Sequence, residues 1–109
     1  MADNPQETMK RYPLAPHHEV KETFADQIGS TMFDGSSLRI DFLVARMNEP
    51  VSPGGAPMGE RHVVSRLVLS MSGAIDLMNQ MSRLAGQLIQ TGVLKTEQGQ
   101  ITPTPAKSN

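Results

Sequence analysis

The stretch RHVVSRLVLSMSGAIDLMNQMSRLAGQLIQTG, residues 61–92, decides the fold because its apolar pattern changes from the period of a strand to that of a helix. As far as Ser70 the pattern is that of a strand with apolar residues on both faces. Val63, Leu67 and Leu69 fall on one face, and Val64 and Val68, which flank Arg66, fall on the other. From residue 71 onward, apolar residues recur at helical spacing. We therefore predict a strand followed directly by a long helix.

Both ends of this helix carry recognisable signals. Ser70 is a good N-cap residue, because its side-chain oxygen can accept a hydrogen bond from a free backbone N–H of the first turn. Gly92 can adopt the left-handed conformation that often terminates a helix, with Val93 placed to contact Leu88. The helix is therefore expected to begin after Ser70 and to end near Gly92.

Two further strands are predicted upstream. Asp34-Gly35 lies between two strand-like runs, and glycine tolerates the positive φ of a tight hairpin turn. After the turn, Arg39 and Asp41 alternate with apolar residues, the period of two of a half-buried strand. The apolar face of that strand comprises Leu38, Ile40, Phe42 and Val44. The element order is strand, strand, strand, helix.

The remaining segments contain few apolar residues. Residues 1–18 are expected to form a mobile arm, because their X-Pro steps favour extended chain over helix. Residues 48–60 combine proline and glycine in an exposed flexible loop, and residues 95–109 are expected to be a disordered tail. We predict one domain over residues 19–94, of the α+β class, with an antiparallel three- to four-stranded sheet and one long C-terminal helix.

The apolar arc of the helix spans about half its circumference, wider than one core-facing stripe. Leu77, Met81, Leu84 and Leu88 lie toward one edge and can pack on the sheet, and both Leu84 and Phe42 are expected to be buried there. The other edge resembles a seam between two helices. We predict that this seam is an oligomer interface, and that it comprises Met71, Ile75, Met78, Ser82, Ala85, Gly86 and Ile89. The alternative is a well-buried helix over a curled sheet.

Composition limits the classes of function. The formal net charge of -1 provides no general attraction for nucleic acid or for an anionic membrane. The chain has no cysteine, so disulfides and thiolate metal sites are excluded. It shows neither a secretion leader nor an apolar run long enough to span a membrane, and a cytoplasmic location is expected.

The segments FADQIGSTMFDGSSLRIDFLVAR and VVSRLVLSMSGAIDLMNQMSRLAGQLI resemble a family of small bacterial proteins that form a domain of unknown function. The resemblance covers roughly residues 20–92. It implies the order strand, strand, strand, helix, and it carries no catalytic residue to transfer. The sequence departs from the family at SMSG, where family members often have proline soon after the capping serine. In the order of its elements the chain is also similar to subunits of the bacterial protein-export chaperone, as an analogy of architecture only.

No motif indicates an enzyme. Adjacent His17 and His18 cannot both easily reach one ion, and with His62 they are the only histidines, so neither a metal nor any other cofactor is expected. No nucleophile elbow or phosphate-binding loop occurs, and no catalytic residue is assigned. Arg39, Asp41, Arg46 and Arg66 are interpreted as cross-strand ion pairs, with an anion-recognising face as the alternative.

These observations favour a non-enzymatic interaction or adaptor protein that forms a homo-oligomer. Its most concrete form is chaperone-like binding of apolar protein segments. Methionines such as Met71, Met78 and Met81 suit a surface that repacks against different partners, but ordinary core filling is the favoured interpretation of these residues. A structural subunit of a larger assembly is the second class, and a small enzyme is the third.

Overall fold

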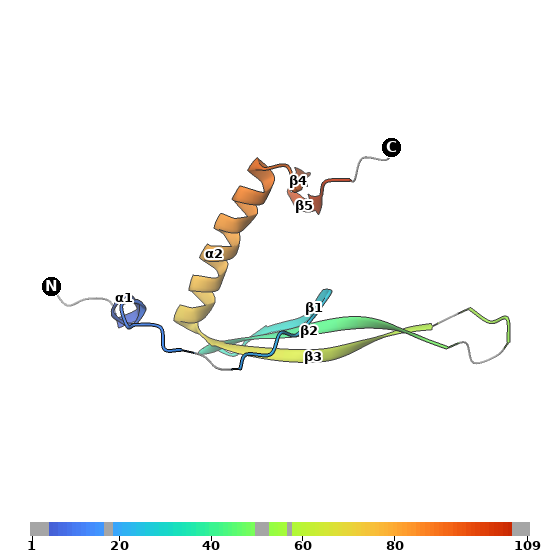
Figure 1. The fold of residues 1–109 in the computed structure, drawn as a ribbon, viewed down its shortest axis with the longest axis horizontal. Coiled ribbons are helices and arrows are strands. Elements are labelled where there is room, and N and C mark those ends of the chain that lie inside the picture. The colour runs from blue at the N-terminus through green and yellow to red at the C-terminus, as the bar shows by residue number, and fades with distance from the viewer. Residues whose placement is uncertain (1–4, 17–18, 50–52, 57, 106–109) are drawn as a thin grey trace. The chain divides into compact units, whose positions relative to one another are not determined.

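A computed structural model describes residues 5–16, 19–49, 53–56 and 58–105. The elements along this part of the chain are α1 (Pro5–Lys10), β1 (Gln27–Phe33), β2 (Ser37–Asn48), β3 (Met58–Ser70), α2 (Met71–Gln90), β4 (Leu94–Glu97) and β5 (Gln100–Pro103) (Figure 1). An antiparallel sheet and one long helix confirm the predicted α+β class. The chain divides into two compact units, Met1–Ser72 and Gly73–Asn109.

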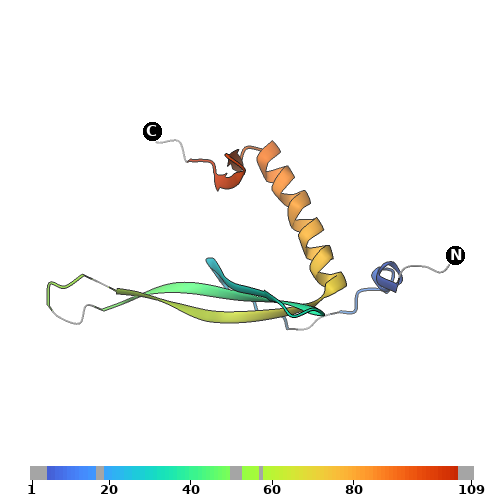
Figure 2. The ribbon, with the colours of Figure 1, turned by 180° about the vertical axis from the view of Figure 1, so that it is seen from behind.

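The first unit contains a three-stranded sheet in the order β1-β2-β3, in which each strand pairs antiparallel with its neighbour in sequence. β2 and β3 pair along nearly their whole length, and they continue beyond β1 as a two-stranded ribbon (Figure 2). The predicted loop over residues 48–60 is therefore shorter than expected, because β2 reaches Asn48 and β3 begins at Met58. Residues 50–52 and 57 of that range lie outside the described residues.

The predicted hairpin at Asp34-Gly35 joins β1 to β2. Gly35 has a φ of 98°, and the backbone N–H of Asp34 donates to the Ser37 carbonyl at 3.2 Å. The Asp34 carboxylate accepts the backbone N–H groups of Ser36 and Ser37 at 3.0 and 2.8 Å. One side chain thus satisfies two backbone donors of the turn, which explains why aspartate precedes the glycine.

The register separates an apolar face of the sheet from a polar face. The apolar face comprises Ile28, Phe33, Leu38, Ile40, Phe42, Leu67 and Leu69, which meet as cross-strand pairs or neighbours. The polar face carries Arg39, Asp41 and Arg66. This division confirms the alternation predicted for β2.

Two β-bulges shift the strands that flank β2. In β1 the register changes between Ile28 and Thr31, and in β3 Val64 is an extra residue between Val63 and Ser65. Val63 therefore pairs with Leu43 on the polar face rather than sharing a face with Leu67 and Leu69 as predicted. A bulge inserts one residue and reverses the alternation beyond it, which counting along a sequence does not detect.

The helix α2 follows β3 without a connecting loop, since Ser70 ends the strand and Met71 begins the helix. At its other end, Gly92 has a φ of 86°, the Gly92 N–H donates to the Ile89 carbonyl at 3.1 Å, and the Val93 N–H donates to the Leu88 carbonyl at 2.9 Å. This hydrogen-bond pair is the Schellman motif, and it confirms the predicted helix end.

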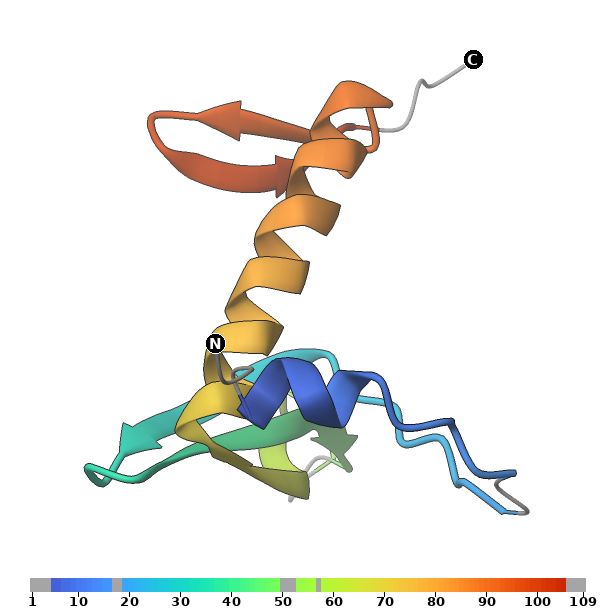
Figure 3. The ribbon, with the colours of Figure 1, turned by 90° about the vertical axis from the view of Figure 1, so that its left-hand side faces the viewer.

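Regular structure also occurs in both terminal segments, where the sequence interpretation placed none. Pro5 is the first residue of α1, and its fixed φ suits the first turn of a helix, which lacks internal N–H bonds. Toward the C-terminus, β4 and β5 form a separate hairpin (Figure 3). Its two-residue turn has positive φ at both Gln98 and Gly99, 51° and 81°, the conformation favoured between two strands. Residues 95–109 were predicted to be a tail because their composition is polar. Backbone hydrogen bonds hold this hairpin together, and a polar composition does not reveal them.

Candidate functional site

Very few apolar side chains are buried in the described part of the chain. Those that are buried are Ile40, Leu43 and Ala74. Many large apolar side chains on the sheet and on α2 remain exposed. Exposed apolar groups are common one at a time, but contiguous sets of them mark surfaces that contact other molecules. The candidate sites of this protein are therefore its apolar surfaces.

The first such surface is the apolar face of the sheet. Ile28 exposes 56% of its surface, and Phe33 and Leu67 are exposed as well. The charged residues that the register places on the same side of the sheet, Arg46 and Glu60, lie further along β2 and β3. Beside Ile28 and Phe42 lies a hollow of about 310 Å³, which Ala25, Asp26 and Gln27 also line. Its size, together with the apolar side chains of Ile28 and Phe42 in its lining, suits an apolar side chain.

Backbone groups at the edge of the sheet adjoin this hollow. In the described sheet β1 pairs with β2 alone, so β1 is an edge strand. The N-terminal end of β1 is fixed on its inner side, where the Asp26 N–H donates to the Leu43 carbonyl at 3.0 Å and the Asp26 carboxylate accepts the Ala45 N–H at 3.2 Å. An extended segment could therefore pair with a well-positioned edge strand.

The second surface is the predicted seam of α2. Ile75 and Met78 expose 45% and 56% of their surface, and Met71, Ser82 and Gly86 are also exposed, whereas Ala85 and Ile89 are half-buried. Because α2 is continuous from Met71 to Gln90, residues at these spacings lie along one side of it. The prediction that Leu84 is buried is wrong for the single chain, since Leu84 exposes 43% of its surface; Phe42 is only half-buried.

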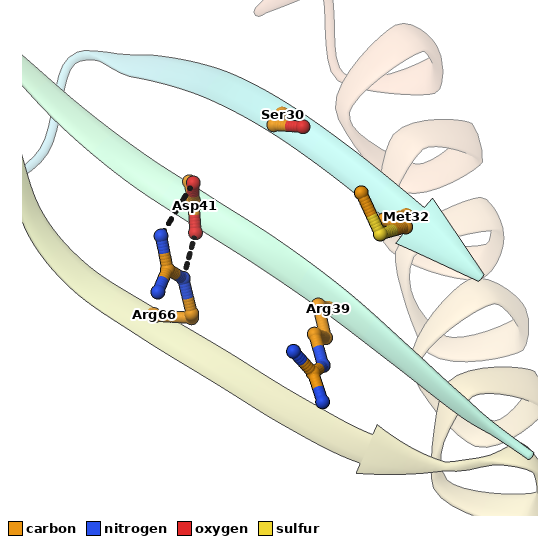
Figure 4. A pocket seen from close by; sticks show the side chains of 5 residues that line it. All are labelled: Ser30, Met32, Arg39, Asp41 and Arg66. Atoms are coloured by element: carbon orange, nitrogen blue, oxygen red, sulfur yellow. Dashed lines mark hydrogen bonds and ion pairs between the residues drawn. The ribbon is translucent and has the colours of Figure 1, made fainter. Parts of the chain in front are cut away.

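A third feature is a hollow of about 240 Å³ on the polar face, lined by Ser30, Met32, Arg39, Asp41 and Arg66 (Figure 4). The Arg66 guanidinium donates to both oxygens of the Asp41 carboxylate, at 2.6 and 3.2 Å. These hydrogen bonds and the charge of Arg66 lower the pKa of Asp41. The predicted cross-strand pairing is confirmed for Asp41 and Arg66.

The arrangement leaves little reactive chemistry in this hollow. The carboxylate of Asp41 is ionised and already accepts two hydrogen bonds, so it is a weak general base. Arg39 lies 3.9 Å from the Asp34 carboxylate and is about half exposed, so its charge remains well solvated. An anion-recognising role for this face has no further support from these contacts.

Metal ligands do not converge in the described residues, where no group of three or more His, Cys, Asp or Glu side chains could hold an ion. His62 lies 3.5 Å from the Glu60 carboxylate. His17 and His18, considered above as ligands, lie outside the described residues. Among the helices in the described part of the chain, none has the length and apolarity needed to cross a lipid bilayer.

No protein-family model, curated protein or solved structure matches the chain. The resemblance to a bacterial domain of unknown function stays a prediction.

Proposed function

We propose that this protein is a non-enzymatic interaction subunit that binds extended apolar segments of other proteins on the apolar face of its sheet. The observation that carries the proposal is the exposure of Ile28, Phe33 and Leu67 on one face of the sheet, around the half-buried Phe42. Burying apolar area of this kind stabilises a complex by about 25 cal/mol per Å². A charged ligand would gain nothing from such a surface, whereas an apolar peptide would.

The site suits an extended occupant for two further reasons. The hollow beside Ile28 and Phe42 is large enough to receive an apolar side chain, which would fix the position of a bound segment. The adjacent edge of β1 can supply backbone hydrogen bonds, which are independent of sequence. Together these features support binding of varied apolar segments, as a chaperone-like adaptor requires. The proposal includes a cytoplasmic location, which a cysteine-free chain permits.

The experiment measures the anisotropy of a fluorescently labelled, permanently unfolded polypeptide titrated with the purified protein. Saturable binding by the natural sequence is expected, and Ile28→Lys is expected to weaken it strongly because a charge would enter the apolar contact. Val68→Lys is the matched control, because Val68 exposes 55% of its surface, against 56% for Ile28, but lies opposite Arg39 on the polar face.

Circular dichroism of each variant establishes that it is folded before binding is compared. Absence of saturable binding by the natural sequence would overturn the proposal, as would equal effects of the two substitutions. Co-purification with one stoichiometric partner, without binding of the unfolded polypeptide, would favour a structural subunit of a larger assembly.

A further inference from the structure

The seam of α2 has an internal symmetry. Six of its seven residues, all except Gly86, form three pairs that are equally spaced on either side of Gln80. These pairs are Met71 with Ile89, Ile75 with Ala85, and Met78 with Ser82. If a second copy of α2 packed against the seam in the opposite direction, one member of each pair would face the other member of that pair in the second copy. Side chains meet in successive layers of this kind between antiparallel helices.

The sizes of the facing side chains are complementary in this arrangement. Ile75 would pack over Ala85, and Met78 would pack over Ser82, so a large side chain meets a small one in the four central contacts that symmetry generates. Helices approach closely where small residues receive larger ones. In a parallel pair Ile75 would instead meet its own counterpart and Ser82 would meet another serine, which crowds one layer and leaves the other underfilled.

The distribution of charge is also compatible with close pairing. Asp76 and Arg83 are the only charged residues of α2, and both lie on the side of the helix away from the seam. Gln80, on the same outer side, donates a hydrogen bond to Asp76 at 3.1 Å. Association along the seam would therefore desolvate no charge, which removes the largest penalty for burying a surface. Antiparallel helix dipoles also attract one another.

We infer that α2 pairs antiparallel with α2 of a second copy of this chain, centred on Gln80. The inference rests on the proposed function in treating the protein as an interaction subunit, but it concerns a surface other than the apolar face of the sheet. The seam would then contact a second copy of α2, in one direction and one alignment.

The absence of cysteine allows a direct test by disulfide cross-linking. Ile75→Cys and Ala85→Cys proteins are prepared separately, mixed, and oxidised. In the antiparallel pair Ile75 faces Ala85 of the other copy, whereas the two residues 75 are about 15 Å apart along the axis, ten residues at about 1.5 Å each. A disulfide requires Cα atoms within about 7 Å. The mixture should therefore give several-fold more cross-linked dimer than either protein alone.

Gln80→Cys provides the matched control, because it lies at the centre of the pairing but on the outer side of the helix. It should cross-link no better than Ile75→Cys alone. Efficient cross-linking of Ile75→Cys with itself would indicate a parallel pair and would overturn the inference. Equal yields from the mixture and from Gln80→Cys would do so as well.

Mass measured by light scattering on a sizing column tests the association itself. The natural sequence should elute as a dimer or a multiple of one, and Ser82→Arg should reduce the mass because the arginine has neither room nor a counter-charge in the seam. Gln80→Arg, on the outer side, should leave the mass unchanged. A natural protein with the mass of one chain, or an oligomer that survives Ser82→Arg, would overturn the inference. Neither result alters the comparison of Ile28→Lys with Val68→Lys, so failure of the pairing and failure of the proposed function are distinguishable.

Discussion

Asp34 shows how a single side chain fixes a turn. Hydrogen bonds from the backbone N–H groups of Ser36 and Ser37 lower its pKa from 3.8 to about 2. These bonds favour the ionised carboxylate in the folded state. The sequence identified this position through the Asp-Gly pair, although the two donors to the carboxylate follow from the turn geometry alone.

The lowered pKa of Asp34 predicts a pH dependence of stability. Because the folded pKa lies below the unfolded one, ionised Asp34 stabilises the fold fully above about pH 4, and this contribution is lost as the pH falls through about 2. Urea titrations between about pH 5 and pH 2 should show the stability difference between the natural protein and Asp34→Asn shrinking toward low pH. A difference that stays constant over this range would contradict the prediction.

Gly29 occupies a position that excludes a side chain. A Cβ atom there would lie 2.8 Å from Cδ1 of Leu43, one of the few buried apolar side chains. Gly29→Ala should therefore lower the free energy of unfolding by about 1 to 3 kcal/mol, as overpacking does.

Gly86→Ala is the matched control for Gly29→Ala. No atom lies within 4 Å of the position that a Cβ would take at Gly86, and the residue is within α2. At a protein concentration low enough to keep the chains separate, this substitution should raise the free energy of unfolding by up to about 1 kcal/mol, because alanine favours helix more than glycine does. Denaturant titrations measure the free energy of unfolding of both variants. If both substitutions changed it in the same direction, the contact with Leu43 would not explain why residue 29 is glycine.

Among the elements, those with a strong apolar period were predicted best. The strand pattern of β2 and the helical pattern of α2 are both present, since each follows directly from which residues can be buried together. The bulges in β1 and β3 were missed, and with them the face of Val63. The elements α1, β4 and β5 were missed because caps and backbone hydrogen bonds, rather than an apolar period, define them.

The end of α2 leads to a prediction about the helix as an element. Gly92→Ala should cost about 1 to 2 kcal/mol, because a side chain at a φ of 86° meets the adjacent carbonyl. Gly92→Asn should cost less, since asparagine tolerates this conformation better. Thermal melting followed by circular dichroism measures both. Equal melting temperatures for Gly92→Ala and the natural protein would show that the Schellman motif is not formed in solution.

For the molecule as a whole, the sequence predicted which residues share one side of α2 but not how exposed they are. Periodicity identifies a side of a helix, and it does not specify whether that side meets the same chain or another one. Leu84 illustrates the difference, because its position in the apolar arc suggested burial and it is exposed in the single chain. The hollow beside Ile28 depends on the register of β1 against β2, which no local pattern encodes.

If the chains associate through α2, their thermal stability should depend on protein concentration. If folded chains pair through α2, raising the concentration from about 1 to 100 μM should increase the melting temperature by several degrees, because pairing draws the equilibrium toward the folded state. For Ser82→Arg the melting temperature should change little over the same range. A flat dependence for the natural protein would show that its folding is independent of association.

The order of strands in the sheet has a consequence for folding kinetics. Every strand in the described sheets pairs with the strand next to it in sequence. Contacts of such short sequence separation need little loop closure, and proteins dominated by them fold quickly. Sheet formation should therefore be a fast, first-order step, and pairing of α2 between copies should follow as a second-order step whose rate falls on dilution.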